Sequence, residues 1–190
     1  MLKERTMVRT DGTRRNTPSD GRGRRIALVC HCLLNANSKV EGLAEYAGVH
    51  PLIARLAELG IGVIQMPCAE MSACGMDRPG RSREEYGYPA FVEHCARLAD
   101  ETLAQVREYQ RCGYEIVGLV GVEGSPSCGV TRSASTGESG CAVPGVHISA
   151  LLERLAPLGV RFVAIDEEFD GHGVDDVVVA LSDGHDPGIV

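Results

Sequence analysis

The sequence contains no tryptophan, and aromatic residues of all kinds make up only 4% of its 190 residues. Its hydrophobic core must therefore consist mainly of valine, leucine, isoleucine and alanine. No run of about 18 apolar residues occurs, which excludes a helix long enough to span a membrane. No apolar segment lies near the first residue either, so we expect no secretory signal and a cytoplasmic protein.

Charge is unevenly distributed along the chain. Residues 1–25 contain eight Lys and Arg against three Asp and Glu, whereas the remaining residues contain 11 against 23. We interpret residues 1–24 as a basic, disordered leader, because they lack apolar periodicity. A nucleic-acid-binding arm is the alternative, but the leader has no aromatic residues for stacking on bases, and the rest of the chain is acidic. We therefore expect no nucleic-acid partner.

Apolar runs alternate with amphipathic segments from residue 25 to the end of the chain. Four runs predict buried strands, at 25–32, 61–68, 114–122 and 160–169. Helices are predicted at 50–60, from Pro89 to 113 and at 146–159. A last helix is predicted at 173–183, although the valine run of this segment would also suit a strand. This order is typical of a parallel sheet covered on both faces. We expect residues 25–190 to form a single α/β domain, a Rossmann-like three-layer sandwich with a mainly parallel sheet of about four to five strands.

Cysteine is frequent, and without a secretory signal its eight residues point to metal binding or catalysis before disulfides. Three of the predicted strands end at cysteines: Cys30 and Cys32, then Cys68, then Cys128. Ligands of parallel α/β sheets bind beyond the carboxyl ends of the strands, so these loops could bring three thiols together. Cys30 and Cys32 would point to opposite faces of a strand, and Cys32, nearer the strand end, is the better candidate. Cys95 and Cys112, in or beside the long helix, are expected to be small core residues.

Three thiolates could hold a zinc ion with one open position or a [4Fe–4S] cluster with three protein ligands. The chain has no CxxC pair, which argues against a zinc ribbon. The spacing of the cysteines alone does not distinguish a zinc site from a [4Fe–4S] cluster.

Motifs at these same residues resemble the thiouracil desulfidase family, and within it the branch of related desulfidases that was formerly a domain of unknown function. The matching segments are "CLLN" (32–35), "QMPCAE" (65–70) followed by Arg78, and "GVEGSPSCGV" (121–130). The resemblance covers about residues 25–170. This sequence departs from the family pattern at Asn35, in the "PCAE" segment, and by having the additional Cys74.

The resemblance implies a Rossmann-like domain whose [4Fe–4S] cluster is held by Cys32, Cys68 and Cys128, with Cys74 as an alternative to Cys68. It also implies a non-redox reaction in which the C=S group of a small thiolated substrate, such as a thiolated nucleobase, becomes C=O and sulfide is released. Glu70 would be the acid/base residue, and Ser125 would donate a hydrogen bond to the substrate or intermediate.

Other functions remain open for the same cysteine trio: an iron–sulfur electron carrier or redox sensor, a zinc-dependent hydrolase, or a binding protein for a thiolated ligand. In a carrier, Cys74 or Cys141 would complete the ligand set. We expect Lys39, Glu41 and Arg78 to line the site, and His31 to be a packed or supporting residue and not a ligand.

Overall fold

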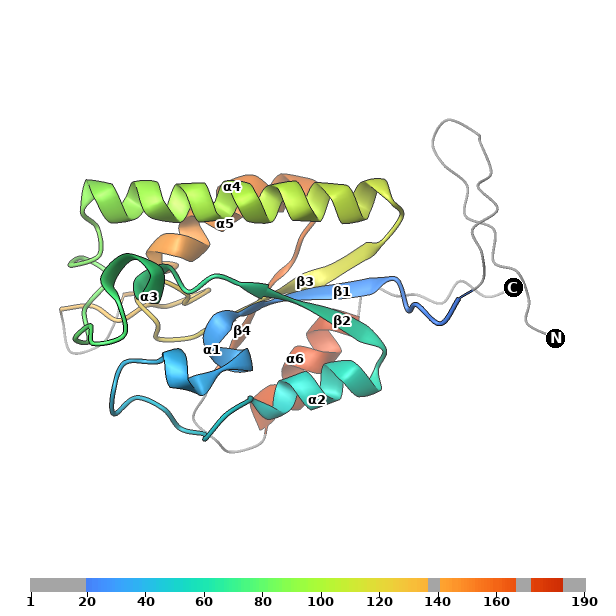
Figure 1. The fold of residues 1–190 in the computed structure, drawn as a ribbon, viewed down its shortest axis with the longest axis horizontal. Helices are drawn as coiled ribbons and strands as arrows, with labels where there is room; N and C mark the ends of the chain where they lie inside the picture. The colour runs from blue at the N-terminus through green and yellow to red at the C-terminus, as the bar shows by residue number, and fades with distance from the viewer. Residues whose placement is uncertain (1–19, 137–140, 167–171, 183–190) are drawn as a thin grey trace.

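The computed structural model describes residues 20–136, 141–166 and 172–182. Four parallel strands form its sheet: β1 (Arg25–Cys30), β2 (Ile61–Met66), β3 (Glu115–Val122) and β4 (Phe162–Ile165), in the order β2-β1-β3-β4. The larger helices are α2 (Pro51–Glu58), α4 (Pro89–Arg111), α5 (Val146–Leu155) and α6 (His172–Ser182). In Figure 1, α4 and α5 cover one face of the sheet, and α2 and α6 cover the other. The predicted three-layer α/β fold is confirmed.

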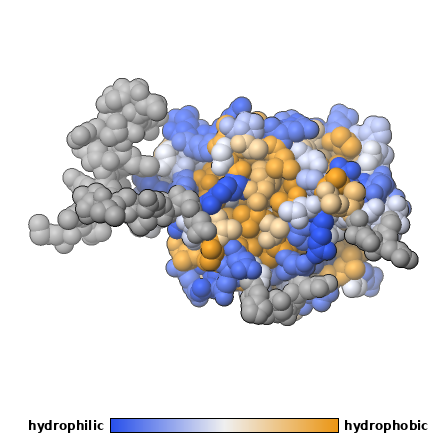
Figure 2. All heavy atoms as spheres, turned by 180° about the vertical axis from the view of Figure 1, so that it is seen from behind, coloured by the Kyte–Doolittle hydropathy of each residue, from blue (hydrophilic) through white to orange (hydrophobic). Residues whose placement is uncertain are grey.

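The sheet is buried because both of its faces are covered. Leu28, Val29, Leu119 and Val120 of the two central strands have no solvent exposure. Continuous apolar runs of this kind are typical of parallel strands that pack against helices on both sides. The face seen from behind in Figure 2 carries hydrophobic residues near its centre and hydrophilic residues toward its margins. Of the described helices, none combines the length and apolar character that a membrane span requires.

Local signals in the sequence set the ends of the helices. His50 caps α2, because its Nδ1 atom accepts a hydrogen bond from the Leu52 N–H at 3.2 Å, and Pro51 takes the first helical position. Pro89 likewise begins α4, which ends before Gly113, a residue with a φ of 78°. The predicted helices therefore agree with the structure to within a few residues.

Two short helices were not predicted, and both follow strands at the site. The strand predicted at 25–32 ends at Cys30, because the chain turns at once into α1 (His31–Leu34). The strand predicted at 61–68 ends at Met66 and is followed by α3 (Ala69–Cys74). The 3₁₀ turns η1 (Ala36–Ser38) and η2 (Ala156–Leu158) complete the elements. Of the predicted leader, only residues 20–24 are described, and residues 1–19 lie outside the described part, as do residues 167–169 of the strand predicted at 160–169.

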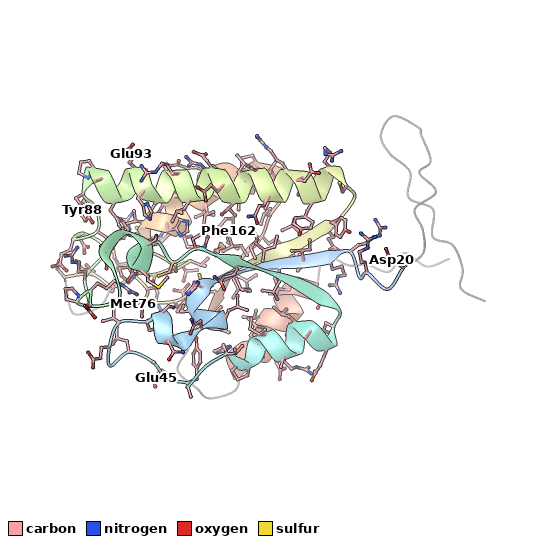
Figure 3. The ribbon with its side chains drawn as sticks, viewed as in Figure 1. Asp20, Glu45, Met76, Tyr88, Glu93 and Phe162 are labelled. Carbon is pink, nitrogen blue, oxygen red and sulfur yellow. The ribbon has the colours of Figure 1, made fainter. Side chains whose placement is uncertain are left out.

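The topology creates a natural binding position. From β1 the chain moves to β2 on one side and then crosses back to β3 on the other, so the loops after β1 and β3 leave the sheet at a switch point where ligands of open α/β sheets bind. Figure 3 places Met76 and Tyr88 at this end of the molecule, near α3, and Asp20 at the opposite end.

Candidate active site

A cavity of about 320 Å³ lies at the carboxyl ends of the strands. Its walls come from the segments that follow β1, β2 and β3. It is lined by the three preferred ligands, Cys32, Cys68 and Cys128, and by the two residues expected to act on the substrate, Glu70 and Ser125. The structure therefore brings these five residues together, although their chemical roles remain predictions.

The three cysteines reach the cavity from three different elements. Cys32 lies in α1, Cys68 is the N-cap residue of α3, and Cys128 lies in the loop after β3. The Cys68 sulfur accepts a hydrogen bond from the Met71 N–H at 3.4 Å. Burial, with a further contribution from nearby Cys128, raises the pKa of the Cys68 thiol to about 11.

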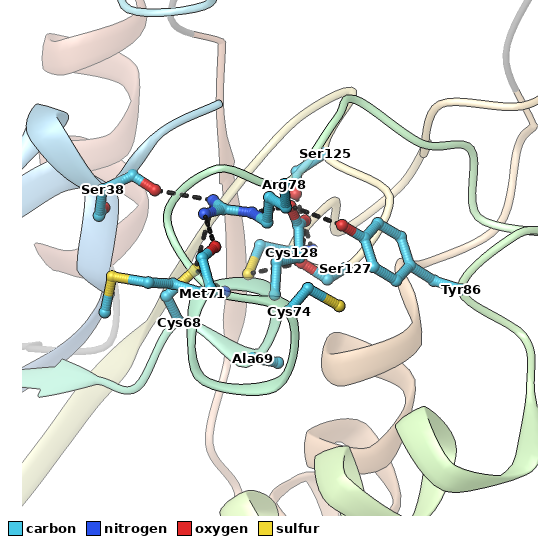
Figure 4. A network of polar contacts seen from close by, with 12 residues as sticks. Ser38, Cys68, Ala69, Met71, Cys74, Arg78, Tyr86, Ser125, Ser127 and Cys128 are labelled. Atoms are coloured by element: carbon cyan, nitrogen blue, oxygen red, sulfur yellow. Dashed lines mark hydrogen bonds and ion pairs between the residues drawn. The ribbon is translucent and has the colours of Figure 1, made fainter. Parts of the chain in front are cut away.

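Cys74, the alternative to Cys68, lies at the other end of α3. It is not among the residues that line the cavity. Its sulfur lies 3.7 Å from the Tyr88 hydroxyl, and in Figure 4 it is directed toward the side of Tyr86. This position favours Cys68 as the cysteine of α3 that faces the cavity.

Glu70 is a buried carboxylate fixed by three donors. Its Oε1 atom accepts a hydrogen bond from the Ser127 hydroxyl at 2.6 Å. Its Oε2 atom accepts from Arg78 Nε at 3.3 Å and from the Tyr86 hydroxyl at 3.5 Å. Such a set of bonds holds a carboxylate in one orientation.

Arg78 joins Glu70 to the surrounding loops. Its side chain is 3% exposed, and its Nη2 atom donates to the Ser38 carbonyl at 2.7 Å. Its Nη1 atom donates to the Gly75 carbonyl at 3.1 Å. The guanidinium thus ties the segment after β1 to the segment after β2, and the prediction that Arg78 lines the site is confirmed.

The two serines of "SPSC" have different partners. Ser125 Oγ accepts a hydrogen bond from the Cys128 N–H at 3.0 Å, so this serine shapes the turn that carries Cys128. Ser127 donates to Glu70, and its Oγ also lies 3.6 Å from the Cys128 sulfur. A hydroxyl donates only one hydrogen, and the shorter distance assigns it to Glu70. Sequence reasoning missed Ser127, and only its position directly before Cys128 pointed to it.

Cys30, the other cysteine near the end of the first strand, does not line the cavity, which agrees with the expectation that Cys32 is the one that reaches it. The buried thiol of Cys30 interacts with that of Cys128. The hydrogen bond from Cys30 lowers the pKa of Cys128 well below the usual value, against the effect of burial. The two cysteines differ because Cys30 is the last residue of β1 and Cys32 belongs to α1, and not because of alternation along one strand.

Of the other residues that the sequence placed near the site, some line the cavity and others do not. Lys39 lines the cavity, whereas Glu41 is not among its lining residues. His31 Nδ1 lies 2.6 Å from Gln65 Nε2, outside the set that lines the cavity, which fits the expected supporting role. Cys95 is fully buried, as predicted, but Cys112 at the end of α4 is only partly buried.

The loop that carries Cys128 is held from both sides. Glu123 Oε1 accepts from the N–H groups of Val130 and Thr131 at 3.1 and 2.9 Å. The N–H groups of His147 and Ile148, at the start of α5, both donate to the Ser127 carbonyl at 3.0 Å. The position of Cys128 is therefore set by the backbone as well as by its own contacts.

The cavity's donors suit a soft metal centre better than a hard one. Thiolates select zinc, copper and iron–sulfur clusters, whereas magnesium and calcium prefer oxygen. Within the described ranges, no group of three or more His, Cys, Asp and Glu side chains is already arranged around a common metal position. The three thiols share one cavity, so the residues present fit a thiolate-bound group by their chemistry.

Comparisons with known proteins identify the family and the fold. A family model described as "Putative 2-thiouracil desulfurase" matches residues 25–149. The chain is 34% identical over 113 residues to "Uncharacterized protein MJ0003" of Methanocaldococcus jannaschii, covering 59% of this chain and 72% of that protein. The solved structure of the [4Fe-4S]-dependent thiouracil desulfidase TudS (DUF523Vcz) is similar in fold, with a TM-score of 0.51, 20% identity, and coverage of 82% of this chain and 99% of that one.

Proposed function

The chain belongs to this 2-thiouracil desulfurase family, and from that premise we propose that it is a [4Fe–4S]-dependent desulfidase that converts a thiocarbonyl to a carbonyl and releases sulfide. The observation that carries the proposal is the shared cavity of Cys32, Cys68, Cys128 and the buried Glu70. The similar structure of TudS, named as [4Fe-4S]-dependent, supports the choice of cluster.

Cys32, Cys68 and Cys128 would hold the cluster, with Cys74 as the competing ligand in place of Cys68. When bound, the cluster would supply an iron with an open position, a soft Lewis acid suited to a thiocarbonyl sulfur. The substrate would be a small thiolated molecule: the thiocarbonyl is suggested by the family description, and a cavity of about 320 Å³ is of the size that accepts a single small ligand.

Glu70 would act as the general base that takes a proton from the attacking water. Two carboxylates line the cavity, and Glu123 is occupied by the loop amides of residues 130–132. Glu70 is held by Ser127, Arg78 and Tyr86, which orient it without covering it completely, because the residue is 8% exposed. Orientation of this kind reduces the reorganisation needed for proton transfer.

Ser125 would direct its hydroxyl proton toward the substrate. Its oxygen already accepts the Cys128 N–H, which fixes the side chain in the wall of the cavity. A serine hydroxyl can accept and donate at once, so the proton remains for a substrate oxygen or sulfur. Ser127, in contrast, would serve Glu70.

The proposal is tested on protein purified without oxygen. Brown protein with about four irons and four sulfides per chain is expected, and it should release sulfide from 2-thiouracil or a related thioamide. Colourless protein with stoichiometric zinc would contradict the cluster and favour the hydrolase. A cluster without sulfide release from any thioamide would contradict the enzymatic assignment.

An electron carrier is the second candidate, because the Cys30 thiol interacts with that of Cys128 and is a further thiol near the trio, although Cys30 does not line the cavity. A carrier usually binds all four irons through protein ligands. Replacing Cys30 with Ser would then change the electron paramagnetic resonance spectrum of the cluster. A desulfidase with three ligands predicts an unchanged spectrum.

A further inference from the structure

Residues 36–48, which begin with η1 and lead to α2, fold into a compact loop whose two ends are joined. The Ala36 N–H donates to the Gly48 carbonyl at 2.8 Å. Loops of this kind, with their ends together, are Ω-loops, and they frequently carry function. In Figure 1 the loop lies at the same end of the molecule as α3. The chain therefore builds a separate structural unit beside the proposed cluster site.

The loop is anchored to two segments that carry residues of the site. The Tyr46 hydroxyl donates to the Cys32 carbonyl at 3.0 Å, which ties the loop to α1. The Ser38 carbonyl accepts from Arg78 Nη2 at 2.7 Å, which ties the loop to the segment after α3 (Figure 4). Because it is held from both sides, the loop keeps a defined position relative to the cavity.

The tip of the loop is a β-turn that places two apolar side chains at the cavity. The Leu43 N–H donates to the Val40 carbonyl at 3.1 Å, and Gly42, the third residue of the turn, has a φ of 84°. A positive φ at this position is typical of a type II turn and suits glycine. Val40 and Leu43, the two ends of the turn, line the cavity, whereas Glu41 and Gly42 do not.

Leu43 lines the cavity although it is 57% exposed to solvent. A single exposed leucine is common on protein surfaces, but this one has apolar companions at the same cavity. We call these residues the apolar wall: Val40, Leu43, Pro126 and Ala134. None of these side chains can hold a metal or move a proton, so their contribution to a reaction is contact with the part of the substrate that does not react.

We propose that Val40 and Leu43 determine substrate specificity by packing against the face of a planar heterocycle that carries the thiocarbonyl group, so that ring-bearing thioamides are preferred to acyclic ones. This inference rests on the proposed function, since it concerns the substrate of the same site. A ring would cover apolar surface of Leu43 that the free protein leaves in water, and a small acyclic thioamide would cover far less of it. A cavity of about 320 Å³ has room for one such ring.

The test compares cluster-containing wild-type protein with Val40→Ser and Leu43→Ser. Sulfide release is measured with 2-thiouracil, which has a ring, and with thioacetamide, which has none. Calorimetry measures the affinity for uracil, which has the same ring without the thiocarbonyl. We expect Leu43→Ser to raise KM for 2-thiouracil and to weaken uracil binding about tenfold, with unchanged kcat and iron content, and Val40→Ser to act in the same direction. The kinetics with thioacetamide should not change.

Val49→Ser is the matched control. Val49 directly follows the loop and is 56% exposed, almost as much as Leu43, but it does not line the cavity. It should behave as the wild type. Wild-type affinity and KM in both Val40→Ser and Leu43→Ser would overturn the inference, as would an equal loss with thioacetamide, an equal loss in Val49→Ser, or a wild type that binds no uracil. A wild type that binds uracil but releases no sulfide from any thioamide would contradict the proposed function, while the uracil affinities of the variants would still test the apolar wall.

Discussion

The hydroxyl oxygen of Ser127 lies 2.6 Å from the Oε1 atom of Glu70, and both side chains are buried. The bond links the loop after β3 to helix α3 across 57 positions of sequence. It shows that the serine next to Cys128 orients the proposed base, whereas Ser125 supports the turn of Cys128 itself.

Replacing Ser127 with Ala should reduce turnover by roughly 10–100-fold while the cluster content remains that of the wild type, because Glu70 loses one of its orienting donors. The free energy of unfolding should fall by about 1.5–3 kcal/mol, the usual contribution of a hydrogen bond to a charged group. Steady-state kinetics, iron analysis and urea denaturation measure the three quantities. An unchanged kcat would show that the Ser127 bond has no part in catalysis.

Replacing Glu70 with Gln should keep the cluster and lower turnover by roughly 10²–10⁴-fold, the usual contribution of a general base. Glutamine preserves the size of the side chain but cannot take a proton from water. Glu123→Gln is the control at the other carboxylate of the cavity, which binds loop amides and should retain activity if the loop stays folded. Full activity of Glu70→Gln would make the acid/base assignment wrong.

Single alanine replacements of Cys32, Cys68 and Cys128 should each abolish the binding of a full cluster, because each would remove one of three ligands. Cys74→Ala should retain the four irons, since Cys74 does not line the cavity. Iron and sulfide analysis after reconstitution distinguishes the variants. Should Cys74→Ala lose the cluster and Cys68→Ala keep it, Cys74 would be the middle ligand.

The metal-free protein should become less stable as the pH rises from about 9 to about 12. Burial raises the pKa of Cys68 to about 11 and that of Cys95 to about 12, from the ordinary value of 9.0. Over this range the unfolded chain releases protons that the folded protein keeps, so the free energy of unfolding falls with increasing pH. Urea denaturation at pH 8 and pH 10.5 measures the change, and Cys95→Ala should flatten it. Equal stability of the metal-free protein at both pH values would contradict the prediction.

Gly145 should not tolerate a side chain. A Cβ atom there would lie 2.3 Å from the Ser127 carbonyl carbon and 2.7 Å from the Cys128 amide nitrogen. Gly145→Ala should therefore cost about 1–3 kcal/mol of stability, as overpacking does, and displace the loop that holds Cys128. Gly48→Ala, where a Cβ would meet nothing within 4 Å, is the control and should be close to neutral. Thermal denaturation and iron content of both variants measure the difference.

The regular elements could be predicted because their signals are local. The apolar runs of the four strands, Pro89 at the start of α4 and Gly113 after its end were enough to place the layers. The short helices α1 and α3 were missed, since helices of 4 and 6 residues are too short to show a periodicity. Cys32 was correctly preferred to Cys30 as the cysteine at the cavity, although it lies in α1 and not in the strand.

By itself, the sequence determined that strands ending in Cys30 and Cys32, Cys68 and Cys128 would meet at one edge of a parallel sheet, because the alternation of apolar strands and helices permits few other arrangements. Only the tertiary structure decided which side chains face each other there: Ser127 and not Ser125 beside Glu70, and Cys30 against Cys128. The directions of side chains in irregular loops depend on long-range hydrogen bonds, and no periodic pattern in the sequence records them.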